Sequence, residues 1–177
     1  MRTMNTRPGD FQAMSVVCGR PVGVLLICLL LAVNGAAGFG QQDSRLVIVV
    51  NPRTPLTQVG LKELKELYLG EISRLGGHEM VPVNHAAHTP IRLAFEKQVL
   101  RMNADEFAQH WKARRFLDTS QKQPTVFRSV ESVKTFVAAE KGAIGYLPYS
   151  ATDASVLVIR KVDNIDLTAK EYPLMTR

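Results

Sequence analysis

The stretch VPVNHAAHTPIRLAF (residues 81–95) predicts a short buried strand, a turn of small residues and then a helix. Thr89 is a favourable N-cap residue, and Pro90 suits the first helical position because that position needs no N–H group. Arg92 falls in the first turn, where the positive end of the helix dipole disfavours a cation. Two interpretations stay open: an anion lies between the free N–H groups and the guanidinium, or Arg92 extends into solvent.

The flanking segments predict strands that alternate with helices. Residues 46–50 (LVIVV) are typical of a strand buried on both faces, as in a parallel sheet covered by helices. Leucines at helical spacing followed by Gly70 predict a helix over residues 61–69. Further helices are expected from residue 89 to about 100, from the cap Asn103 to about 117, and after the cap Ser129. Further strands are expected at 80–83, 143–147 and 156–162, with a polar loop at 118–124 and an edge segment at 172–174. This alternation predicts an α/β fold with a mixed, mostly parallel sheet flanked by helices.

Residues 1–40 predict a secretory signal peptide, which leaves residues 41–177 as one domain of ordinary size. An apolar run over residues 22–33 follows three arginines and precedes small residues. The run is shorter than the about 20 residues of a membrane-spanning helix. Cleavage after residue 37, 38 or 40 fits the pattern, and a retained membrane anchor is the alternative. The prediction places the domain in the periplasm.

Cysteine content and charge exclude several classes of function. Cys18 and Cys28 both lie in the predicted signal peptide, so the remaining chain has no disulfide, thiol nucleophile or thiolate metal site. The signal peptide holds three of the 22 basic residues and one of the 16 acidic residues, so the remainder carries a net charge of +4. This charge is spread along the chain and lacks interleaved aromatic residues, which argues against nucleic-acid binding.

The sequence contains no pattern typical of an enzyme. It has no P-loop, no dinucleotide-binding glycine motif, no zinc-protease motif and no nucleophile elbow. His85 and His88 offer two imidazoles from one turn, but two ligands do not make a metal site. We therefore expect a protein without catalytic activity, cofactor or bound metal.

Five motifs in order resemble the phosphate-binding component of ABC transporters, the periplasmic phosphate-binding-protein-like family. They are LVIVVNP at 46–52, LxxLxxLYLGxI at 61–72, VxV at 81–83, TxxRxxF at 89–95 and GAIGYLP at 142–148. The resemblance implies a single periplasmic-binding-protein-like lobe. It also implies phosphate or another small anion as ligand and an ABC permease as partner.

The chain departs from this family in two respects. A full member has two α/β lobes that close around the ligand, and residues 41–177 suffice for one. The family's anion motif usually reads Ser-Gly-Thr-Arg, where this chain has Thr89, Pro90, Ile91 and Arg92. The replacements remove one hydroxyl and one backbone donor. The alternative is therefore an envelope adaptor module or a homodimer that has lost ligand binding, because a lone lobe exposes the face that a second lobe covers.

The expected anion site lies at the start of the helix in residues 81–95. Thr89, Arg92 and the first-turn N–H groups hold the anion, with Asn84 and His88 at the edge. Ligands of open α/β sheets favour the carboxyl ends of strands, so Asn51 and Tyr146 are expected on the same rim. For Tyr146, a half-buried packing residue is the alternative.

Overall fold

A computed structural model describes residues 44–117 and 122–176 of the chain. The predicted signal peptide at residues 1–40 lies outside the described residues, as do residues 118–121 of the predicted polar loop. None of the helices in the described part of the chain is long and apolar enough to cross a membrane.

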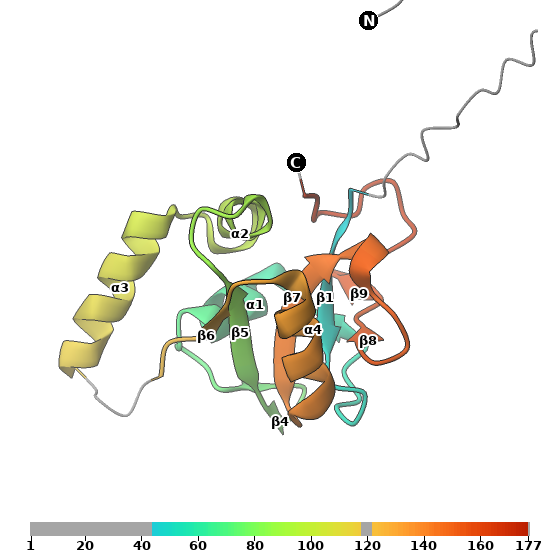
Figure 1. Ribbon diagram of the computed structural model, residues 1–177, viewed down its shortest axis with the longest axis horizontal. Helices are drawn as coiled ribbons and strands as arrows, with labels where there is room; N and C mark the ends of the chain where they lie inside the picture. Colours follow the sequence, from blue (N-terminus) through green and yellow to red (C-terminus); the bar gives the residue numbers. More distant parts are fainter. Residues whose placement is uncertain (1–43, 118–121, 177) are drawn as a thin grey trace, which may run out of the picture. The chain divides into compact units, whose positions relative to one another are not determined.

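The main sheet has five strands in the order β6-β5-β7-β1-β8 (Figure 1). They are β1 (Leu46–Val50), β5 (Val81–His85), β6 (Thr125–Phe127), β7 (Ala143–Pro148) and β8 (Leu157–Val158). Strand β5 is parallel to β6 and β7, whereas β1 is antiparallel to β7 and β8. The predicted mixed α/β sheet is confirmed, and its parallel part is the β6-β5-β7 half.

Strand β1 is buried on both faces, as its apolar run predicts, but its direction differs from the expected parallel arrangement. Leu46, Ile48 and Val50 pack in one apolar cluster with the helices that follow β2 and β5. Val47 and Val49 pack in a second cluster with the helix that follows β6. A strand is buried on both faces when helices cover both sides of the sheet, whether its neighbours are parallel or antiparallel. The apolar run therefore predicted the burial of β1 but not its direction.

Four α-helices lie in the described chain, and the second continues as a π-helix. They are α1 (Leu61–Tyr68), α2 (Pro90–Phe95) continued by the π-helix η1 (Glu96–Leu100), α3 (Ala104–Leu117) and α4 (Val130–Ala139). The predicted caps are confirmed at two of them: Asn103 Oδ1 accepts from the N–H groups of Asp105 and Glu106, and Ser129 Oγ accepts from Ser132 N–H. Gly70, with φ +72, ends α1 as predicted.

Two small sheets lie beside the main one. Strands β2 (Gln58–Val59), β9 (Lys161–Val162) and β10 (Ile165–Asp166) form one, and β3 (Arg74–Leu75) pairs with β4 (His78–Glu79) in the other. The predicted single strand at 156–162 is wrong, because β8 pairs with β1 whereas β9 pairs with β2. The chain changes partner at Ile159, whose N–H donates to Ile48, and Arg160, whose N–H donates to Thr57. A short 3-10 helix, η2 (Tyr149–Ala151), follows β7.

Candidate functional site

The site is built where the parallel strands β5 and β6 end. His85 pairs with Phe127 in register, and the N–H of Ala86 donates to the Phe127 carbonyl at 2.9 Å. Strand β5 leads through a short turn into α2, and β6 leads into α4, so both helices begin at this edge of the sheet (Figure 1). We call it the β5–β6 edge. The carboxyl ends of parallel strands are where open α/β sheets bind ligands.

Thr89 occupies the N-cap position of α2, and Pro90 is the first helical residue, as predicted. The Thr89 hydroxyl, however, donates to the Ala86 carbonyl at 2.8 Å instead of capping the helix. This bond closes the turn between β5 and α2. The first turn of α2 therefore has no side-chain cap.

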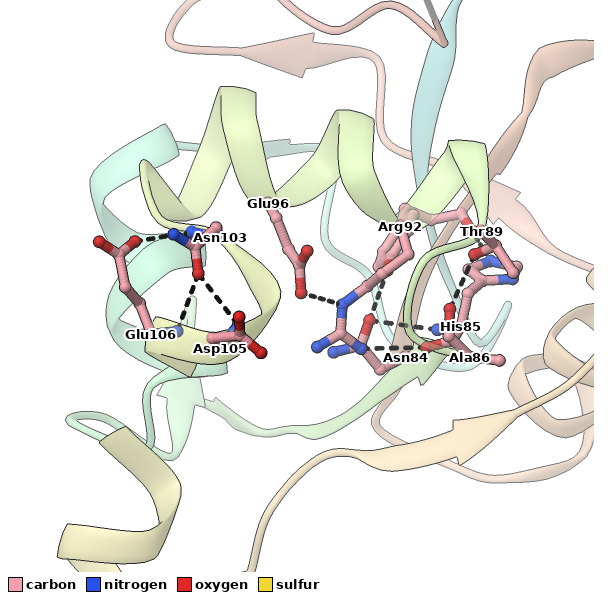
Figure 2. Close-up of polar contacts among 10 residues, drawn as sticks. Asn84, His85, Ala86, Thr89, Arg92, Glu96, Asn103, Asp105 and Glu106 are labelled. Atoms are coloured by element: carbon pink, nitrogen blue, oxygen red, sulfur yellow. Dashed lines mark hydrogen bonds and ion pairs between the residues drawn. The ribbon is translucent and has the colours of Figure 1, made fainter. Parts of the chain in front are cut away.

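Arg92 points into the protein and is 4% exposed, so the interpretation that it extends into solvent is wrong. Its Nε donates to Glu96 Oε1 at 2.6 Å, and its Nη1 donates to the His85 carbonyl at 3.0 Å (Figure 2). The guanidinium also lies 4.7 Å from the centre of the Phe107 ring. The positive charge of Arg92, which was expected to bind an anion, is therefore paired with the carboxylate of Glu96 one helical turn away.

Asn84 and Tyr146, which were expected on a ligand-binding rim, contact each other inside the protein. The Tyr146 hydroxyl donates to Asn84 Oδ1, which also accepts from the His85 N–H at 3.1 Å. Both side chains are fully buried, and the Tyr146 ring stacks on Phe95 with 3.9 Å between centroids. Tyr146 therefore matches the packing alternative. Asn84 Nδ2 has no hydrogen-bond partner among the described residues.

His85 is buried beside Asn84 and Tyr146. The sequence had indicated it only as one of two histidines in a possible metal site. Its Nε2 lies 2.8 Å from the Tyr146 carbonyl oxygen. Burial lowers the pKa of His85, and the Tyr146 carbonyl opposes that shift. Burial likewise raises the pKa of the Tyr146 hydroxyl, so the phenol stays protonated.

Asn51 does not lie at the β5–β6 edge, so the expectation of one rim shared by Asn51, Asn84, Thr89 and Tyr146 is wrong. Strand β1 is antiparallel to β7, and its carboxyl end therefore lies at the opposite edge. There the Asn51 N–H donates to Ala143, and its Nδ2 donates to the carbonyls of Val137 and Ala138 at 2.9 Å. Asn51 caps the carboxyl end of α4.

His88 is exposed and has a positive φ of 65°, and it lies two residues after Ala86. The structure adds two groups that the sequence analysis did not consider as ligands, Arg128 and Ser129, which follow β6 and are exposed. Strand β6 has only three residues, which is too short for a periodic pattern, so the sequence could not predict that Arg128 and Ser129 lie at this edge. Glu96 was also missed, although its spacing of four residues from Arg92 is that of a helical ion pair.

His85 and His88 do not converge, since one ring is buried against Tyr146 and the other is exposed. Residues 44–117 and 122–176 hold no group of three or more His, Cys, Asp or Glu side chains with metal-site geometry.

The solved structures that are similar to this chain include the following three proteins. An ABC-type phosphate transport receptor from Vibrio cholerae is 23% identical with a TM-score of 0.55, over 70% of this chain and 48% of that chain. A phosphate ABC transporter substrate-binding protein from Clostridium perfringens, solved with bound phosphate, is 23% identical with a TM-score of 0.60, over 73% and 51%. PstS from Borrelia burgdorferi is 15% identical with a TM-score of 0.56, over 73% and 53%.

The chain has the fold of a phosphate-binding-protein-like lobe. The lobe spans about half the length of each of these three proteins. The first two are a transport receptor and a substrate-binding protein, and these are not enzymes. No protein-family model and no curated protein matches the sequence.

Proposed function

We propose that this lobe is a periplasmic solute-binding module that holds phosphate or another small oxyanion at the β5–β6 edge. The observation that carries the proposal is the pairing of His85 with Phe127, because it brings the starts of α2 and α4 to one edge. Helix N-termini present free N–H groups and a positive partial charge, and both favour an oxyanion.

Exposed donors at this edge support the proposal. His88 precedes α2, and Arg128 and Ser129 precede α4. An arginine offers a planar fork of N–H groups that matches an oxyanion, which makes Arg128 the principal cationic ligand in this proposal. Glu131 in the first turn of α4 lies 3.1 Å from Lys134, which also pairs with Asp153 at 2.8 Å, so the ammonium offsets the Glu131 charge only in part.

Arg92 and Asn84 act in this proposal as positioning residues behind the edge. Arg92 fixes the His85 carbonyl through its Nη1, and Asn84 accepts the His85 N–H. Together they hold the end of β5, from which the turn to Thr89 departs. Anion affinity then depends on the N–H groups, His88 and Arg128, and not on direct contact with the Arg92 guanidinium.

The cellular setting is part of the same proposal. Residues 1–40 serve as the signal peptide, and the exported domain works with an ABC permease. The support is the sequence pattern of that segment and the descriptions of the similar structures, which are a phosphate transport receptor and a substrate-binding protein that contains phosphate.

Isothermal titration calorimetry with phosphate, sulfate and small organic acids tests anion binding. We expect saturable heat for at least one oxyanion, and about a tenfold loss of affinity in Arg128→Ala, as for one charge-assisted hydrogen bond worth about 1.4 kcal/mol. The matched control is Lys62→Ala, which removes a cation that is 88% exposed on α1 and leaves affinity unchanged. Folded protein that gives no heat with any of these anions contradicts the proposal.

A second candidate function, an envelope adaptor or homodimer, is favoured by one observation. Phe116 and Leu117 at the carboxyl end of α3 are 82% and 89% exposed. Large apolar side chains exposed together mark protein-interaction sites. Sedimentation velocity over a range of concentrations tests self-association, with Phe116→Ser/Leu117→Ser expected to abolish it. A protein that stays monomeric and captures no envelope partner contradicts this second function.

A further inference from the structure

The carboxyl end of α3 exposes two adjacent large apolar side chains. Phe116 and Leu117 are 82% and 89% exposed, more than any other large apolar side chain that the structure describes. Figure 1 shows α3 beside the main sheet, with this end directed away from the sheet. Apolar surface in contact with water is unfavourable, so an exposed pair of this size points to a contact that removes it from water.

The rest of α3 is fixed to the protein. Trp111 is 1% exposed, and Nε2 of His110 lies 2.9 Å from the Leu69 carbonyl oxygen. One turn later, Nη2 of Arg114 donates to the Gly70 carbonyl at 2.5 Å. The helix is therefore held against the end of α1 as far as Arg114, and the residues that follow in α3 project beyond this contact.

Basic side chains accompany the apolar pair. Lys112 and Arg115 are exposed on the last two turns of α3. Residues 112–122 hold four basic residues and one acidic residue, Asp118, which lies outside the described residues. This stretch of sequence therefore carries a net charge of +3.

Acidic side chains of the neighbouring helix α1 and its end do not cancel this charge. Glu66 is paired with Lys62 on α1. Glu71 follows the Gly70 carbonyl that Arg114 contacts, and it lowers the net charge near this end of α3 to +2. Cations at the carboxyl end of a helix also balance the helix dipole, but that role does not explain the two exposed apolar side chains.

We propose that the α3 tip, formed by Lys112, Arg115, Phe116 and Leu117, docks on the surface of a bilayer that contains anionic lipid. Phe116 and Leu117 enter the boundary between headgroups and acyl chains, and the two cations contact lipid phosphates. The lysine beside an exposed aromatic and aliphatic pair favours a lipid surface over a protein partner, because protein interfaces are depleted in lysine. This contact is separate from anion binding at the β5–β6 edge and does not rest on it.

Vesicle flotation tests the contact, with exported protein and vesicles of phosphatidylcholine alone or mixed equally with phosphatidylglycerol. We expect at least tenfold stronger binding to the mixed vesicles, and at least tenfold weaker binding to them in Phe116→Ser/Leu117→Ser and in Lys112→Glu/Arg115→Glu. The matched control is Lys62→Glu/Lys170→Glu, which reverses two exposed charges outside α3 and should leave binding within about twofold. A control that weakens binding as much as the α3 tip variants, or equal binding to both kinds of vesicle, overturns the proposal.

Lipid that carries a nitroxide label locates the contact on the protein, whatever the state of residues 1–40. It should broaden the ¹⁵N-amide signals of Phe116 and Leu117 and leave those of His88 and Arg128 sharp. Broadening at His88 and Arg128 instead, or release of the protein by added phosphate, would assign the lipid phosphates to the β5–β6 edge and overturn the proposal.

Sedimentation velocity without lipid separates a membrane contact from a protein contact. The protein should stay monomeric at all concentrations. Self-association that Phe116→Ser/Leu117→Ser abolishes would assign the apolar pair to a second copy of the chain and overturn the proposal. A failed anion titration leaves these results unaffected, because all four residues of the α3 tip lie on α3 and not at the β5–β6 edge.

Discussion

The Nε atom of Arg92 lies 2.6 Å from Oε1 of Glu96, and the two side chains are only 5% and 1% exposed. Arg92, the arginine of the predicted anion motif, is therefore part of the protein core. Removing one partner of such a buried pair destabilises the protein, because the other charge is left buried without compensation.

The first prediction concerns that pair. Arg92→Met should lower the free energy of unfolding by about 3–5 kcal/mol, and Arg92→Met/Glu96→Leu should lower it less, because no charge is left buried. Lys62→Met is the control, since the Lys62 side chain is 88% exposed and its ammonium lies 3.7 Å from Glu66, and this variant should cost less than about 1 kcal/mol. Urea unfolding followed by circular dichroism measures all three. A double variant less stable than Arg92→Met would contradict the explanation.

The second prediction concerns the close approach of Gly142 to strand β4. Its φ is +83°, and a Cβ atom there would lie 2.5 Å from the Glu79 carbonyl oxygen. Gly77 has a φ of +82° with no atom within 4 Å of the same position. Both alanine variants carry the backbone cost of about 1–2 kcal/mol, but only Gly142→Ala adds a clash with backbone. Thermal unfolding should therefore show a clearly larger loss of stability for Gly142→Ala than for Gly77→Ala. Equal losses of stability in the two variants would exclude the clash.

The third prediction concerns the Tyr146 hydroxyl. Tyr146→Phe removes the hydrogen bond to Asn84 but keeps the ring stacked on Phe95, so it should cost about 1 kcal/mol of unfolding free energy. Tyr149→Phe, at a residue that is 39% exposed, should stay within about 0.5 kcal/mol of the original protein. Chemical denaturation at neutral pH compares the two. A cost for Tyr149→Phe as large as for Tyr146→Phe would argue against the buried hydrogen bond.

The fourth prediction concerns pH. Burial lowers the pKa of His85 from its ordinary value of 6.5, so below that pH the unfolded chain binds a proton more readily than the folded one. The contribution of His85 to stability is therefore fully present above pH 6.5 and declines as the pH falls through 6.5 toward the folded pKa. Unfolding free energies measured between pH 7.5 and 5.5 should fall less steeply in His85→Gln than in the original protein. Parallel pH profiles would show that His85 is not the responsible group.

Local features of the sequence predicted most helix boundaries and strand cores. Asn103 and Ser129 begin helices, and Gly70 ends one, because a cap depends on side chains within three or four residues. The run at residues 46–50 likewise predicted a strand buried on both faces. Strand β6 and the small sheets were missed, since strands of two or three residues are too short to show a period.

The candidate site was predicted less completely, and the reason is long-range pairing. Residues at the end of β5 were placed correctly near one another, because Asn84, Thr89 and Arg92 are close in sequence. Asn51 was misplaced because the direction of β1 depends on its pairing with β7, almost 100 residues later. Arg128 was missed because only the pairing of β6 with β5 brings it to the edge.

The sequence by itself determined the α/β class, the caps Asn103 and Ser129 and the strand–turn–helix unit at residues 81–95, because these follow from backbone preferences and from the local spacing of apolar residues. Tertiary structure alone decided the direction of β1, the separation of β8 from β9 and the orientation of Arg92. A guanidinium in the first turn of a helix can face solvent, an anion or a buried carboxylate. Only the packing of α2 and α3 around Glu96 and Phe107 selects among these positions, since it encloses the side chain with its partners.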